Sequence, residues 1–207
     1  MKLTSYLAAL SLAGLASAHF TLNYPTSRGS DHDTQTTGPC GGLSTSSSRT
    51  AVDADGFPVA ITSSHTSGGF AVYFCPKSSC TTASDFNITL LDTILEEGAG
   101  NFCMPEISIP ESVLSSNGTM NGTVQVMMIS DDGNLYNCAD VSLSRISGAS
   151  SSSQCTNGTG VTATSWTEST STATASSAST SATETSAAQR LVPALALVAG
   201  AVGLAMA

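Results

Sequence analysis

The chain has 207 residues and carries 15 acidic residues against 6 lysines and arginines, which gives a formal net charge of −9. The phosphates of DNA and RNA repel so acidic a chain, so nucleic acid is excluded as a partner. The six cysteines are even in number and contain no C-x-x-C pair, which favours disulfides in an oxidising compartment over a zinc site.

Residues 1–18 have the pattern of a secretory signal peptide. Lys2 is followed by the apolar run Leu7–Leu15 and by the small-residue cleavage site Ala16-Ser17-Ala18. Cleavage at this site makes His19 the first residue, with a free α-amine beside its imidazole. These two nitrogens can chelate one metal ion, and nitrogen ligands in a planar arrangement suit Cu(II). The junction therefore predicts a copper ligand at the mature N-terminus.

Short β-rich runs separated by polar turns fill the region from residue 19 to residue 149. No apolar pattern with a 3.6-residue period reaches helical length there. We therefore predict an all-β domain at residues 19–149, an immunoglobulin-like antiparallel β-sandwich stabilised by disulfides. The runs that carry this prediction are Phe20–Tyr24, Val59–Ile61, Phe70–Phe74, Phe86–Leu91, Thr123–Ile129 and Leu135–Leu143.

Three disulfides are expected within this domain. The short loop between Cys75 and Cys80 predicts that these two cysteines bond to each other. The other two predicted pairs, which spacing does not select, are Cys40–Cys138 and Cys103–Cys155.

From residue 150 onward the composition is typical of a cell-surface stalk and anchor. Residues 150–188 are Ser, Thr and Ala with almost nothing to bury, which predicts a disordered, O-glycosylated stalk. Residues 189–207 resemble a GPI-attachment signal that is removed, with the attachment site between Ser177 and Ser186. A membrane-spanning helix is the alternative, at the lower limit of spanning length. We expect the protein at the extracellular face of the plasma membrane and cell wall. Four predicted N-glycosylation sites fit this route: Asn87, Asn117, Asn121 and Asn157.

A second imidazole is needed to complete a metal site, and the chain offers only His32 and His65 beside His19. His65 lies in a polar turn between two β-rich runs, where a sandwich presents ligands at its edge. His32 lies in the charged loop Asp31-His32-Asp33, where we expect an ordinary solvated side chain. His65 is therefore the predicted partner of His19.

The motifs that carry a family resemblance are His19-Phe-x-Leu-x-Tyr-Pro25, Arg28, Gly38-Pro-Cys-Gly-Gly42, His65, Phe102-Cys-Met-Pro105 and Leu135-Tyr-x-Cys-Ala-Asp140. Together they resemble one family, the fungal copper-binding proteins related to lytic polysaccharide monooxygenases, whose members are GPI-anchored copper acquisition factors. The resemblance implies an immunoglobulin-like sandwich that holds one Cu(II) in a histidine brace, here His19 and His65, with an added aspartate ligand. It also implies a copper transporter or a wall glycan as a further partner.

The aspartate is assigned to Asp140. It falls inside a predicted strand two residues after Cys138, so both side chains point to the same face. A carboxylate inside a strand is costly without a partner, and copper would supply one. Asp131 and Asp132 precede Gly133 in a predicted turn, where aspartate is common for conformational reasons alone.

These features predict a non-catalytic cell-surface protein that holds Cu(II) for copper acquisition or buffering at the fungal wall. An anionic ligand favours Cu(II) and fills coordination space, which opposes oxidative turnover. The first alternative is a copper-dependent lytic polysaccharide monooxygenase, disfavoured because the only tryptophan, Trp166, lies in the predicted stalk. The second alternative is a structural GPI-anchored wall glycoprotein.

Overall fold

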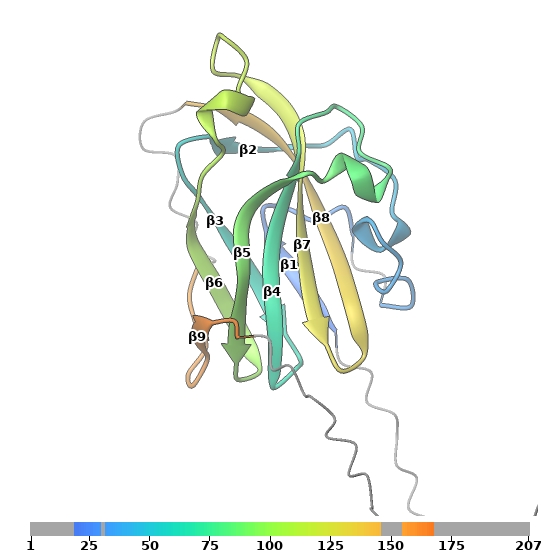
Figure 1. Ribbon diagram of the computed structural model, residues 1–207, viewed down its shortest axis with the longest axis vertical. Coiled ribbons are helices and arrows are strands. Elements are labelled where there is room, and N and C mark those ends of the chain that lie inside the picture. Colours follow the sequence, from blue (N-terminus) through green and yellow to red (C-terminus); the bar gives the residue numbers. More distant parts are fainter. Residues whose placement is uncertain (1–18, 30–31, 146–154, 168–207) are drawn as a thin grey trace, which may run out of the picture. The chain divides into compact units, whose positions relative to one another are not determined.

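The computed structural model describes residues 19–29, 32–145 and 155–167. The predicted signal peptide, the predicted anchor signal and most of the predicted stalk lie outside these residues. The described residues form an all-β domain of two sheets, which confirms the predicted fold class (Figure 1).

The smaller sheet has three strands in the order β1-β3-β6, and the larger sheet has six in the order β2-β8-β7-β4-β5-β9. All strand pairs are antiparallel except β2 with β8, which is parallel. The strands are β1 (Phe20–Tyr24), β2 (Thr50–Asp53), β3 (Phe57–Ser63), β4 (Ser67–Cys75), β5 (Ile88–Glu97), β6 (Gly100–Ile107), β7 (Met120–Ser130), β8 (Gly133–Ser144) and β9 (Thr162–Ser165).

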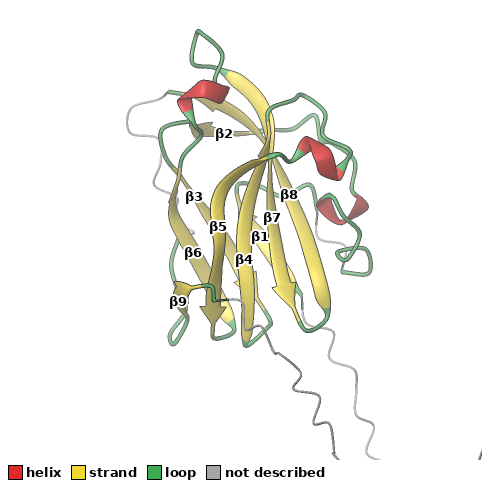
Figure 2. Cartoon of the chain, viewed as in Figure 1, coloured by secondary structure: helices red, strands yellow, loops and turns green. Residues whose placement is uncertain are grey.

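Helical structure in the described residues is limited to three short 3-10 turns (Figure 2). These are η1 (Cys40–Gly42), η2 (Ala83–Asp85) and η3 (Glu111–Val113). No helix in the described part of the chain is long and apolar enough to cross a membrane.

The core lies between the two sheets and is built from alternating strand residues, as a half-buried sheet requires. Phe20 of β1 meets Phe70 of β4 edge to face, with ring centroids 5.4 Å apart, which joins the two sheets at the start of β1. Other fully buried members include Phe57, Ile61 and Phe74. This packing fixes where the first residues of β1 lie.

The domain extends beyond the predicted boundary at residue 149. β9 pairs with β5, and Cys155 bonds to Cys103, so both lie within what was predicted as stalk. All four residues of β9 are exposed and small or hydroxylated, so their composition matches that of the stalk. Trp166, also assigned to the stalk, lies against Gly69 of β4: its ring is 2.7 Å from where a Cβ on that glycine would stand.

The three predicted disulfides are present: Cys40–Cys138, Cys75–Cys80 and Cys103–Cys155. The four sequon asparagines, which are Asn87, Asn117, Asn121 and Asn157, are all exposed. Glycosylation at these sites remains a prediction that their exposure permits.

Candidate metal centre

The register between β1 and β3 brings His19 next to Ser64, the residue before His65. Phe20 pairs with Ser63, and the Ser64 amide donates a hydrogen bond of 2.9 Å to the His19 carbonyl. His65 is the next residue, in the turn between β3 and β4. Two histidines that are 46 positions apart in the sequence thus share one end of the sandwich.

The hydroxyl of Ser64 holds the backbone of His19 from two sides. It accepts a hydrogen bond of 2.7 Å from the His19 nitrogen and donates one of 2.6 Å to the His19 carbonyl. Cleavage after Ala18 would turn this nitrogen into the α-amine. Ser64 therefore holds the atom that the predicted chelate needs, and nothing in the sequence pattern marks this serine among its many neighbours.

His65 is buried, with 8% of its surface exposed. Its amide donates a hydrogen bond of 3.2 Å to the hydroxyl of Ser63, whose side chain is also buried. His19 is half-buried. His65 is therefore the more buried of the two and lies in the turn between β3 and β4, while His19 is more exposed and lies directly before β1.

Gln35 is a second supporting residue that sequence reasoning missed. Its buried side chain donates to the Phe20 carbonyl at 2.7 Å and accepts from the Phe20 amide at 3.3 Å. Its own carbonyl accepts from the Tyr136 amide of β8 at 2.8 Å. These bonds tie the loop after residue 32 to both sheets beside His19.

His32 is exposed to solvent, as predicted, but it also contacts His19. Its imidazole lies edge-on to that of His19, with ring centroids 4.7 Å apart and ring planes at 64°. The side chain remains exposed to solvent. The same end of the molecule therefore presents three imidazoles rather than two.

Asp140, the predicted carboxylate ligand, binds an arginine instead. Arg28 donates two hydrogen bonds of 2.8 Å, one to each carboxylate oxygen, and the Ser46 amide and Thr123 hydroxyl add bonds of 2.7 Å each. Burial by itself would raise the pKa of Asp140, but the bonds from Arg28, Thr123 and Ser46 outweigh it and leave the pKa below its usual value. The partner that a buried carboxylate requires is thus Arg28.

Strand register also separates Asp140 from the histidines. Asp140 lies seven positions along β8 from Gly133, or roughly 23 Å at the rise of a β-strand. The β7–β8 turn is at the histidine end, because Ile129 of β7 pairs with Gly69 and Asp131 lines a surface hollow together with Ser67 (Figure 1). We therefore correct the prediction that Asp140 is a ligand.

Two carboxylates near the histidine end are those of Asp131 and Asp132. Both are exposed in the turn between β7 and β8. Their sequence context does not mark them as ligands, because aspartate suits such a turn in any protein. Only the pairing of β7 with β4, which the sequence does not display, brings them near the turn that carries His65.

The donor set at this end fits copper, for which imidazole nitrogen is a favoured ligand. Within the described ranges, no three His, Cys, Asp or Glu side chains are already close enough to hold a metal ion. The full chain carries Ala18 before His19, so the nitrogen of His19 belongs to a peptide bond there. The amine that completes the predicted chelate forms only on cleavage.

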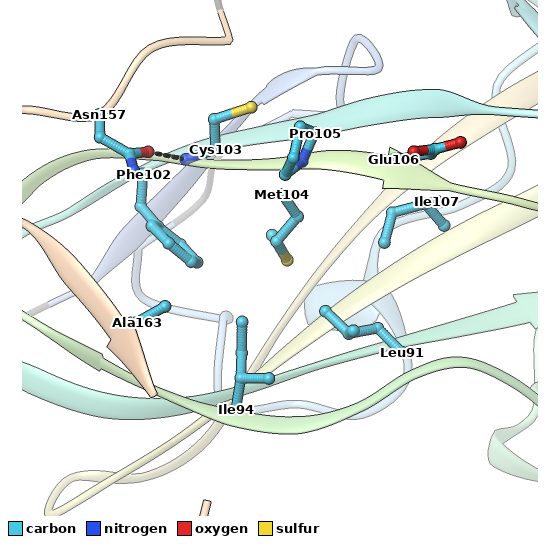
Figure 3. A pocket seen from close by; sticks show the side chains of 10 residues that line it. All are labelled: Leu91, Ile94, Phe102, Cys103, Met104, Pro105, Glu106, Ile107, Asn157 and Ala163. Carbon is cyan, nitrogen blue, oxygen red and sulfur yellow. Dashed lines mark hydrogen bonds between the residues drawn. The ribbon is translucent and has the colours of Figure 1, made fainter. Parts of the chain in front are cut away.

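A second hollow of about 380 Å³ lies between β5 and β6 and has a different character (Figure 3). Phe102, Met104 and Ile107 of β6 and Leu91 and Ile94 of β5 point into it, so its lining is mainly apolar. It contains no histidine. This hollow is therefore not a candidate for the metal centre.

Comparison with known proteins relates the chain to proteins named for copper. The sequence profile of a family described as copper acquisition factor BIM1-like matches residues 17–160. The chain is 42% identical over 165 residues to the lytic polysaccharide monooxygenase-like protein X325 of Yarrowia lipolytica, covering 77% of this chain and 61% of that protein. It is 33% identical over 162 residues to the copper acquisition factor BIM1 of Cryptococcus neoformans var. grubii, covering 75% and 73%.

An uncharacterized protein of Aspergillus fumigatus is 41% identical over 162 residues, covering 76% of this chain and 66% of that protein. The chain thus spans about two thirds or less of the Aspergillus and Yarrowia relatives. The match to the family profile nevertheless includes every strand before β9 and both histidines of the predicted brace. The chain belongs to the copper acquisition factor BIM1-like family.

Proposed function

We propose that this protein binds Cu(II) at the cell surface without catalysis, for copper acquisition or buffering. The α-amine and Nδ1 of His19 and the imidazole of His65 would hold one ion per domain. The observation that supports the proposal is the bonding of Ser64, the residue before His65, to the backbone of His19 at one end of the sandwich.

A carboxylate from the Asp131–Asp132 turn takes the role that the sequence assigned to Asp140. An anionic oxygen ligand favours Cu(II) over Cu(I) and occupies coordination space. Both effects favour holding the ion over oxidative turnover. Copper acts here as cargo, and the protein's own part is to bind and orient it.

The location and the anchor belong to the same proposal. Sequence features support a GPI-anchored protein at the outer face of the plasma membrane. Its partners would be the copper ion and a copper transporter or wall glycan. A copper-holding domain at this location would meet extracellular copper before any transporter does.

A copper-dependent lytic polysaccharide monooxygenase is the second candidate, and one observation favours it. Trp166 belongs to the domain, and it lines a hollow with Ser67 and Asp131 at the histidine end. An aromatic ring can stack against a sugar ring, so a tryptophan within the domain removes the reason for disfavouring the enzyme. A purely structural wall glycoprotein is the third candidate.

The test uses residues 19–168, a compact unit that retains β9, produced with His19 as the first residue. We expect one Cu(II) per chain by titration, and loss of tight binding in His65→Ala. The copper EPR spectrum should change in Asp131→Asn or Asp132→Asn and stay unchanged in Asp140→Asn. Release of oxidised oligosaccharides from glucan or chitin with ascorbate would instead establish the monooxygenase.

A further inference from the structure

His32 is the one histidine to which the proposed copper site gives no role. Its ring contacts the ring of His19 from the loop that follows β1, at a centroid separation of 4.7 Å. Its side chain is exposed, whereas His65 is buried. Solvent exposure therefore increases in the order His65, His19, His32.

The separation of the two rings suits ligands of a single ion. An imidazole nitrogen binds a metal at about 2.0–2.1 Å, and the ring centre lies roughly 1.1 Å further on. Two rings bound at right angles to one ion therefore have centroids about 4.5 Å apart. The ring centroids of His19 and His32 are 4.7 Å apart, close to that separation.

The loop that carries His32 is fastened to the strands beside His19 on the C-terminal side of His32. Gln35 bonds to the backbone of Phe20, and the Thr37 amide bonds to the Thr34 carbonyl at 2.7 Å, which closes a turn. Cys40 is joined to β8 by its disulfide with Cys138. His32 is thus presented to His19 by a braced segment.

We propose that His32 is a third imidazole ligand of the copper ion, on the solvent side of the site. This inference rests on the proposed function, because it requires the ion to bind at His19. An exposed ligand on a loop is the first nitrogen that an arriving ion meets, and it is the most easily exchanged for a ligand of an acceptor. His32 therefore serves capture and release as well as holding.

The test compares the wild-type unit 19–168 with His32→Ala and His32→Phe. The phenylalanine keeps an aromatic ring against His19 but has no nitrogen to donate. Thr36→Ala is the matched control, because Thr36 is exposed on the same loop. Each protein is titrated with Cu(II), and the nitrogen superhyperfine lines of its EPR spectrum are recorded.

We expect both His32 variants to lose at least about tenfold in copper affinity and to show one coupled nitrogen fewer than wild type, while Thr36→Ala matches wild type. Spectra and affinities unchanged in both variants would overturn the role of His32 while leaving the brace intact. Loss in His32→Ala with full retention in His32→Phe would also overturn it, since the ring would then only pack. Failure of the wild type to bind copper would instead refute the proposed function itself.

Discussion

Asp140 and Glu96 are both buried carboxyl groups of the larger sheet, and their surroundings differ. Asp140 receives hydrogen bonds from Arg28, Ser46 and Thr123, which keep its pKa low. Among the described residues, neither side-chain oxygen of Glu96 has a hydrogen-bond partner, and burial raises its pKa to about 7. Asp140 forms a structural ion pair with Arg28, whereas Glu96 lies near the histidine end without a hydrogen-bond partner among the described residues.

The comparison shows how a carboxylate inside a strand should be judged. Asp140 looked like a metal ligand because it needed a partner, but Arg28 supplies that partner from 112 positions away. Glu96 pairs with Gly68, three residues after His65, and remains uncompensated. A buried carboxylate in a strand therefore predicts a hydrogen-bonding or charged partner, and that partner can be an arginine as well as a metal.

The largest expected effect comes from breaking the ion pair of Asp140. Arg28→Ala leaves a buried carboxylate without its arginine, which should destabilise the domain by about 3–5 kcal/mol. Chemical denaturation monitored by circular dichroism measures the free energy of unfolding. The control is Arg145→Ala, which removes an exposed arginine paired with Asp55 and Glu111 and should change little. Equal effects of the two variants would refute the structural role of the Arg28–Asp140 pair.

Glu96 should make stability depend on pH in the direction opposite to Asp140. The folded protein keeps the Glu96 proton up to a pH of about 7, whereas the unfolded chain loses it near 4.5. The folded state therefore binds more protons in this window, and stability falls as pH rises through it and stays reduced above it.

Glu96→Gln removes this dependence and should be more stable than wild type at pH 8 by roughly 3 kcal/mol, with little difference near pH 4.5. The check is the free energy of unfolding of both proteins at a series of pH values. Parallel curves for wild type and variant across this range would show that Glu96 ionises normally.

The smallest structural effect is expected at Ser64. Ser64→Ala removes the hydroxyl that bonds both backbone polar atoms of His19, at a cost of about 1 kcal/mol in stability. We expect a larger relative loss in copper affinity, because the amine of His19 is no longer held beside His65. Ser64→Thr retains the hydroxyl and should restore affinity. If the Ser64→Ala and Ser64→Thr variants bind copper equally well, the hydroxyl of Ser64 does not position His19.

The sequence was sufficient for the main fold because alternating apolar runs mark half-buried strands, as in Phe70–Phe74 of β4 and Thr123–Ile129 of β7. It was insufficient for β9, where hydroxylated and small residues pair at a sheet edge without burying anything. The family resemblance predicted both histidines of the proposed brace. No local pattern could show that Arg28 pairs with Asp140 or that His32 contacts His19, since both contacts depend on how separate segments fold together.

The central claim is that cleavage before His19 creates the copper site. The most direct measurement is Cu(II) affinity of two versions of residues 19–168, one starting at His19 and one carrying a single extra alanine before it. The extra residue converts the amine into a peptide nitrogen and leaves every side chain in place. We predict tight binding only in the version that starts at His19; equal affinity in the two versions would contradict the account.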